Sequence, residues 1–255
     1  MEYRQNLSFY GFKTNGQSTH NARTMMLKEL SLLLQIVNNP NATSDEYRRE
    51  IIENNCLGKN SGISRKKSES HLLNMYALDP ELLVFRALRY FWQRDLGGHP
   101  LLAFTCVFSR DYLIKGITPF ILKKSEGEKV SKEPIKEILN ELRPGVFSSA
   151  TLESTAQNIL STFVQSGHLK GRLNKIRVNA IPTAGTAAYS LLLGYICGYR
   201  GELLLSCEYA NLLDCSLGKT VELAETASRS GWISFKHIGN VYDVSFPNKD
   251  LGVIQ

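Results

Sequence analysis

The stretch from residue 133 to residue 180 limits the possible folds more than any other part of the chain. It opens with two helical patterns, the second running from Ala150 to Gln165, and a turn at Pro144-Gly145 separates them. Two short strand-like pieces follow, around Gly171 and Asn174. Helix, turn, helix and hairpin in this order are typical of a winged-helix unit. We therefore expect this part of the chain to form such a unit.

The charge of this stretch points to a class of partner. No Asp or Glu occurs between Ser154 and Gly201. The same residues include several cations: Lys170, Arg172, Lys175, Arg177 and Arg200. A basic hairpin beside an exposed helix suits a polyanion, and nucleic acid is the commonest such partner. A helical domain that happens to end in a basic turn is the alternative, and this stretch alone does not decide between the two.

The second helix of the stretch has an apolar face and a polar face. Leu152, Ala156, Ile159 and Phe163 share the apolar face. The polar face carries short side chains of the kind that contact phosphates and base edges. We predict DNA contacts from this face and from the hairpin, at Ser149, Thr151, Thr155, Asn158, Lys170, Arg172, Lys175 and Arg177.

A second basic element is predicted nearer the N-terminus, where a helix is expected to open at Ser64. Its first turn would hold Arg65, Lys66 and Lys67. The helix dipole disfavours cations at this end. A recognition helix offers a reason for them, because it presents its N-terminal residues to DNA. We therefore predict DNA contacts from these three residues, with a solvated basic turn as the alternative.

The chain has 255 residues, enough for one large domain or for two to three small ones. Residues 101–108 are apolar nearly all round, which indicates a central buried helix. The charged segment 123–132 is the best interior boundary. The expected fold class is mainly α, a helical bundle with helix-turn-helix or winged-helix units and short β-hairpins. Three units are expected: an N-terminal helical domain with a helix-turn-helix (1–122), a central winged-helix-like unit (123–182), and a C-terminal helix with a further winged-helix-like unit (183–255).

The C-terminal unit is expected to repeat the central arrangement, because its pattern also has helices followed by a hairpin. Residues 232–235 and 241–244 alternate in polarity and flank the dipeptide Gly239-Asn240, which is a strong hairpin signal. This unit is less basic, because acidic side chains offset its Lys and Arg residues. Whether it binds DNA or a protein partner stays open.

Motifs for catalysis or metal binding are not found in the sequence. The five cysteines form no CxxC pair, and the five histidines are isolated from one another. Gly218-Lys219-Thr220 resembles the end of a P-loop, but Leu213 stands where that motif requires glycine. We therefore expect a protein that is not an enzyme and that has no cofactor and no metal site.

Apolar segments are too short for a membrane helix, which needs roughly 20 residues. The N-terminal residues lack the apolar core of a signal peptide. Together with unpaired cysteines, these features favour the cytoplasm and no membrane partner. The net charge of +6 is mild and becomes informative through its uneven distribution.

Several segments resemble the BrxA-like family of BREX phage-defence systems. They are ENNCL (53–57), SRKKSESHLLNMY (64–76), the apolar helical middle and TLESTAQNILSTFVQSGHL (151–169). The resemblance covers residues 20 to 200 and rests on apolar spacing. It implies a cytoplasmic, non-enzymatic component of an anti-phage system whose helix-turn-helix elements contact double-stranded DNA, with other defence proteins as further partners.

Two other functions remain open at this point. An autonomous winged-helix transcription regulator would be a dimer and would recognise a palindromic site. An assembly subunit would use the same helix-turn-helix units to bind proteins of a larger complex.

Overall fold

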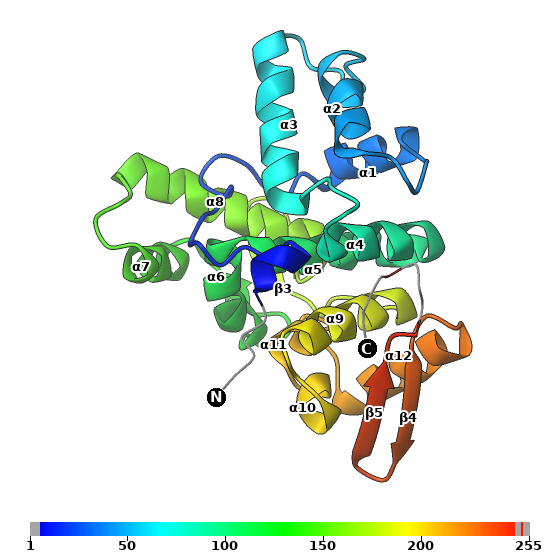
Figure 1. Ribbon diagram of the computed structural model, residues 1–255. Helices are drawn as coiled ribbons and strands as arrows, with labels where there is room; N and C mark the ends of the chain where they lie inside the picture. The colour runs from blue at the N-terminus through cyan, green and yellow to red at the C-terminus, as the bar shows by residue number, and fades with distance from the viewer. Residues whose placement is uncertain (1–5, 248–250, 252–255) are drawn as a thin grey trace.

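The computed structural model describes residues 6–247 and 251, and it is mainly helical with two small antiparallel sheets. Figure 1 shows three helices standing as a lobe above the rest of the molecule. These helices are α1 (Leu27–Ile36), α2 (Ser44–Ile52) and α3 (Gly62–Tyr76). Helix α2 begins with a capping box, because the Thr43 side chain accepts from the backbone N–H of Glu46 and the Glu46 side chain accepts from that of Thr43.

Four helices build the centre of the molecule. They are α4 (Leu83–Arg94), α5 (His99–Arg110), α6 (Tyr112–Leu122) and α9 (Ala184–Ile196), and the 3-10 turns Leu7–Tyr10 and Leu96–Gly98 accompany them. Every residue of α5 from Leu101 to Arg110 is buried, which confirms the predicted central helix. Helix α9 is nearly as buried and packs against α4 and α5.

The middle of the chain forms a three-stranded sheet with two helices. Its elements are β1 (Lys129–Val130), α7 (Glu133–Leu142), α8 (Ser149–Gln165), β2 (Leu169–Lys170) and β3 (Lys175–Arg177). The strand order is β1-β3-β2, and both pairings are antiparallel. Strand β1 was not predicted, because a two-residue strand in a charged segment has no alternating pattern. The segment expected to be a boundary therefore contributes an edge strand.

The C-terminal part contains α10 (Gly201–Leu205), α11 (Glu208–Asn211), α12 (Leu217–Arg229), β4 (Ser234–Ile238) and β5 (Val241–Ser245). Strands β4 and β5 form the predicted hairpin, with Gly239-Asn240 at its tip. Helix α10 was not predicted, and it packs against β5. Figure 1 shows this hairpin projecting at the bottom of the molecule.

One hydrophobic cluster runs through all three parts of the chain, from Phe12 to Leu251. The phenolic hydroxyl of Tyr189 on α9 donates to the carbonyl of Val84 on α4 at 2.8 Å. The rings of Phe91 and Trp232 meet edge to face, with centroids 6.0 Å apart. The expected units therefore share a core, and their division at residues 122 and 182 stays a prediction.

The described residues contain neither a membrane-spanning helix nor a cluster of metal ligands. Across residues 6–247 and 251, no helix combines the length and the hydrophobicity of a membrane span. In the same part of the chain, no three His, Cys, Asp or Glu side chains lie close enough together to hold a metal ion.

Candidate nucleic-acid interface

The loop between β2 and β3 is an exposed basic turn. Lys170 and Arg172 are exposed, and Leu173 between the strands is 92% exposed. Gly171 has a φ of +99°, and a Cβ atom there would lie 2.0 Å from the carbonyl oxygen of Asn174. Only glycine fits this position, so the sharp turn that presents Arg172 is set by one residue.

Lys175 and Arg177 do not present their charges at the surface, contrary to expectation. Both lie on β3, the middle strand, and are 7% and 2% exposed. The Lys175 ammonium donates to the carbonyls of Gly171 and Arg172, each at 2.9 Å, and burial lowers its pKa. Lys175 therefore stabilises the loop between β2 and β3 and does not offer its charge to DNA, contrary to the prediction from the sequence.

Arg177 is bound by a carboxylate from the C-terminal part of the chain. Its guanidinium donates to the two oxygens of Asp214 at 2.7 and 2.5 Å, and also to the carbonyl of His168 at 3.3 Å. Such a bidentate pair satisfies the charge internally. No local signal marks this partner, because Asp214 lies 37 residues away in the sequence.

The fully exposed polar side chains of α8 lie in its first half, between Ser149 and Gln157. Ser149 is exposed next to the N-cap residue Ser148, whose hydroxyl lies 2.9 Å from that of Thr151. Ser154 and Gln157 are exposed on the following turn. Glu153 lies among them, and its carboxylate pairs with Lys132 and Lys136. This face is therefore polar with small side chains and is not itself basic.

The chain's own N-terminal segment, residues 13–27, is hydrogen-bonded along the second half of α8. Thr155 is fully buried, and the Asn158 amide donates to the carbonyl of His20 at 3.0 Å. The Thr162 hydroxyl accepts from the backbone N–H of Met25 at 2.9 Å. Thr155 and Asn158 therefore do not reach a partner in this conformation. The covering segment has no sequence period, so this contact could not be predicted.

Buried polar groups hold this segment against α8. His20 Nδ1 lies 2.8 Å from Asp111, and His20 Nε2 lies 2.9 Å from the Thr162 hydroxyl. Carboxylate, imidazole and hydroxyl follow one another as in a hydrolase triad. All three residues are nevertheless 3% exposed or less, so no substrate reaches the hydroxyl. Burial alone would raise the pKa of Asp111, but His20 and hydrogen bonds from Thr19 and Ser18 outweigh it and lower the pKa.

The cations of α3 lie elsewhere on the molecule. Helix α3 begins at Gly62 and not at Ser64, so these cations follow its first turn and the dipole penalty on them is smaller. Lys66 and Lys67 are exposed, whereas Arg65 donates to the carbonyl of Ile52 at 2.9 Å and joins α3 to α2. In Figure 1 this end of α3 is at the top and β3 is in the middle. The two basic groups therefore do not form one patch.

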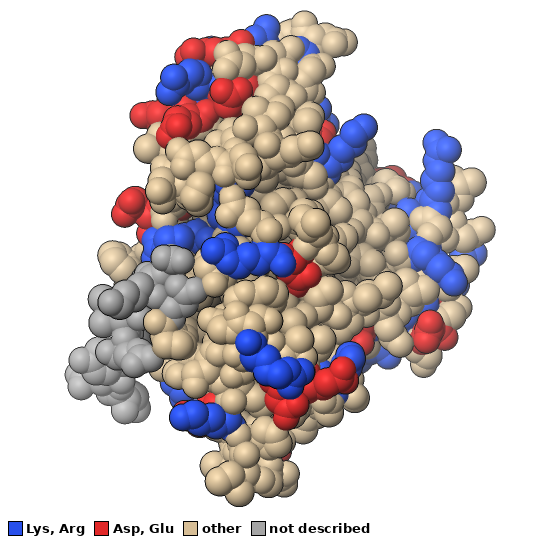
Figure 2. All heavy atoms as spheres, turned by 90° about the vertical axis from the view of Figure 1, so that its right-hand side faces the viewer, with Lys and Arg blue, Asp and Glu red and all other residues tan. Residues whose placement is uncertain are grey.

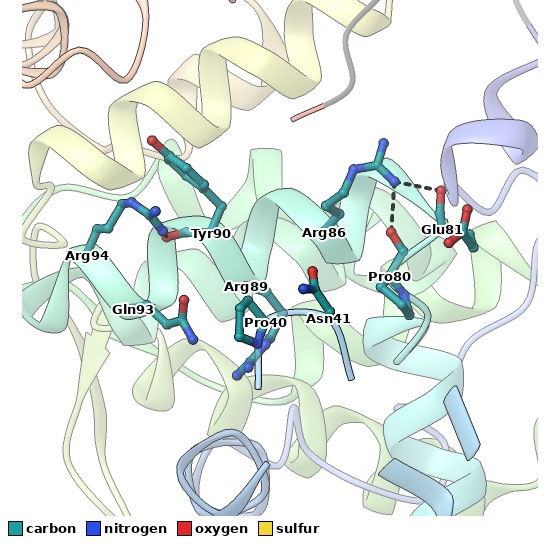
Figure 3. Close-up of a pocket in the computed structure, with 9 residues that line it drawn as sticks. All are labelled: Pro40, Asn41, Pro80, Glu81, Arg86, Arg89, Tyr90, Gln93 and Arg94. Carbon is teal, nitrogen blue, oxygen red and sulfur yellow. Dashed lines mark hydrogen bonds between the residues drawn. The ribbon is translucent and has the colours of Figure 1, made fainter. Parts of the chain in front are cut away.

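A pocket along α4 collects arginines that sequence reasoning did not single out (Figure 3). Arg86 donates to the carbonyls of Pro80 and Glu81 at 2.8 and 2.9 Å. Buried Arg89 donates to the carbonyls of Leu34 in the last turn of α1 and of Val37 and Asn39 just after it. Arg94 lies over the ring of Tyr90, 3.7 Å from its centroid. These contacts hold helix ends and turns together, which is a structural role.

No protein-family model matches the sequence of this chain, and no curated protein matches it either.

Proposed function

We propose that α6, β1, α7, α8, β2 and β3 form a winged-helix unit. The observation that carries this proposal is the order of its elements: helix, strand, helix, helix, strand, strand. The strand between the first two helices pairs with the last strand of the unit, so the sheet closes in the order β1-β3-β2. In this arrangement α8 takes the place of the recognition helix and residues 170–174 take the place of the wing.

We infer that this unit binds double-stranded DNA. Lys170 and Arg172 would contact phosphates from the wing, and Ser149, Ser154 and Gln157 would lie against the duplex from α8. Lys66 and Lys67 would add a separate phosphate contact from α3. Because the sequence resembles BrxA-like proteins, we propose that this protein is a non-enzymatic component of a bacterial phage-defence system.

Fluorescence anisotropy with a labelled duplex tests this proposal. Replacing Lys170 and Arg172 together by alanine removes two phosphate contacts without disturbing buried groups. We expect weaker binding and a plot of log affinity against log salt that is shallower by roughly 2. The matched control is the double variant Arg229→Ala and Lys236→Ala, which removes two exposed cations from the C-terminal unit.

The outcomes separate the parts of the proposal. A parent protein that ignores duplex DNA at low salt would rule out DNA binding. If the wing variant binds as the parent does, the wing is not the contact. If only the control variant loses binding, the DNA reader is the C-terminal unit.

A protein-binding role has its own supporting observation at the C-terminal hairpin. Ile238 and Val241 flank its tip and are 88% and 75% exposed. On the face that Figure 2 shows, the surface at this projecting end is mostly uncharged. Apolar side chains at a solvent-exposed tip favour contact with another protein. Co-purification of a larger complex that is lost in the double variant Ile238→Ser and Val241→Ser would support an assembly subunit.

A further inference from the structure

A second basic pocket lies where the N-terminal segment meets the ends of three helices. Its volume is about 410 Å³. Its cations come from distant parts of the sequence: Lys13 from the N-terminal segment, Arg110 from the end of α5, and Arg143 from the residue after α7. Gln17 and Thr19 add an amide and a hydroxyl. No Asp or Glu among the described residues lines this pocket.

The cation at the back of the pocket is built into the fold. Arg110 is 7% exposed and donates only to backbone carbonyls, those of Gly11, Leu73 and Asn74. Leu73 and Asn74 belong to the last turn of α3, whose dipole offsets part of the charge. Carbonyls orient the guanidinium but leave its net charge in place.

Lys13 and Arg143 have N–H groups available for a ligand. The Lys13 ammonium donates to the side-chain oxygen of Asn74 at 2.7 Å and keeps two further N–H groups. Arg143 lies 5.9 Å from the ring centroid of Tyr112, and within residues 6–247 it forms no ion pair. Both side chains line a cavity in which their charges repel one another.

The carboxylate of Asp111, next to Arg110 in the sequence, already has its own partners. Asp111 is 3% exposed, and its oxygens already accept from Ser18, from His20 and from the backbone N–H groups of Thr19, Leu113 and Ile114. Burial and Arg110 lower the pKa of Lys13 to about 8, against the opposing effect of Asp111. Cations that repel one another in a polar cavity are stabilised when an anion binds among them.

We propose that this pocket binds a phosphate group. Arg143 supplies a planar fork and Lys13 a point charge, the two donor types that recognise phosphate in proteins. Arg110 and the neighbouring hydroxyl and amide complete a polar wall around it. The pocket along α4 is a poorer candidate, because the Glu81 carboxylate lines it and offsets part of its positive charge. The proposal does not depend on the proposed DNA binding.

Isothermal titration of the full chain with inorganic phosphate at constant ionic strength is the first test. We expect saturable binding to one site, weakened roughly ten-fold or more by Arg143→Gln through loss of charge-assisted hydrogen bonds. Arg94→Gln is the matched control, because it removes an arginine that also lies against a tyrosine ring, in the other pocket. No saturable binding by the parent, or equal losses in the two variants, overturns the proposal.

The pH dependence of sulfate binding is the second test, because sulfate keeps its charge over this range. Lys13 faces Arg110, Arg143 and Asp111, and it attracts an anion only while protonated. Affinity should therefore fall as pH rises through about 8, and Lys13→Met should remove this dependence. A parent protein whose sulfate affinity is the same on both sides of that pH contradicts the role of Lys13, even if Arg143→Gln does not fold.

The source of the phosphate is distinguished by adding DNA. If inorganic phosphate displaces a bound duplex and Arg143→Gln weakens duplex binding, the pocket takes a backbone phosphate. If phosphate binds and duplex binding is unchanged in Arg143→Gln, the ligand is a small phosphate compound. Both results require the same phosphate site, and only the partner that carries the group differs.

Discussion

At the scale of single residues, burial decides which charges are available to a partner. Arg172 and Arg177 lie five positions apart on one hairpin and are both basic. Arg172 is exposed on the turn, whereas Arg177 is buried and paired with Asp214. The same residue type therefore serves as a candidate contact at one position and as a structural tie at the other. Exposure, and not charge alone, identifies the candidate.

The pair between Arg177 and Asp214 leads to a prediction about stability. Asp214→Asn keeps the shape of the side chain and tolerates the left-handed φ of +54° at this position, but it leaves a buried guanidinium unpaired. We expect unfolding free energy to fall by about 3 kcal/mol in urea titrations followed by circular dichroism. Glu222→Gln, which breaks the exposed pair with Lys219, should change it by less than about 0.5 kcal/mol. Equal stability of the two variants would contradict a structural role for the pair.

At the scale of elements, the N-terminal segment and α8 form one unit although they are far apart in the sequence. Met25 and Leu27 donate backbone hydrogen bonds to the side chains of Thr162 and Gln165 on α8. This contact fixes how much of the proposed recognition helix is free. It also places Lys13 and Thr19 beside the turn that follows α7, which completes the basic pocket.

Thr162→Val tests the connection between this segment and α8. The substitution keeps the shape of the side chain but removes the acceptor of the Met25 N–H and the partner of His20. We expect the free energy of unfolding to fall by about 1–3 kcal/mol, because the buried Met25 N–H and the His20 ring lose their hydrogen-bond partner. Trypsin should cleave faster after the exposed Arg23.

The control for that experiment is Ser161→Ala on the same helix. Its hydroxyl donates only within α8, to the carbonyl of Gln157 at 2.8 Å. This variant should resemble the parent in stability and in cleavage. Unchanged cleavage of the Thr162→Val variant would show that the segment is held by other contacts.

At the scale of the whole molecule, one core joins parts of the chain that the sequence suggests as separate units. Helices α5 and α9 are buried on nearly all sides, and each needs the other parts of the chain as cover. The lobe of α1, α2 and α3 also contributes residues to this cluster. Cooperative folding of the entire chain is the expected consequence.

Two tryptophans report on this cooperativity from different thirds of the chain. Trp92 is on α4, and Trp232 precedes β4 and contacts Phe91. The variants Trp92→Phe and Trp232→Phe each leave one fluorescent reporter. We expect one transition in urea for each variant, with its fluorescence and far-UV circular dichroism midpoints coinciding. In either variant, separate fluorescence and circular dichroism midpoints would show that the predicted units unfold independently.

Sequence by itself determined the helical class, the buried helix at residues 101–108 and the C-terminal hairpin. It also placed the two helices and the hairpin of the central unit. These features depend on local pattern: helical spacing, the serines at the start of α8, and a Gly-Asn turn. Interactions between residues a few positions apart can be predicted from the sequence, because both partners lie in the same short stretch.

The tertiary structure alone decided the edge strand β1, the burial of Lys175 and Arg177, and the cover over Thr155 and Asn158. It also brought Lys13, Arg110 and Arg143 into one pocket. Most of these features depend on a partner tens of residues away, so no local sequence pattern predicts them. Of the predicted DNA contacts, those on the wing and the exposed ends of α3 and α8 remain candidates, because only there does no other part of the described chain take up the side chain.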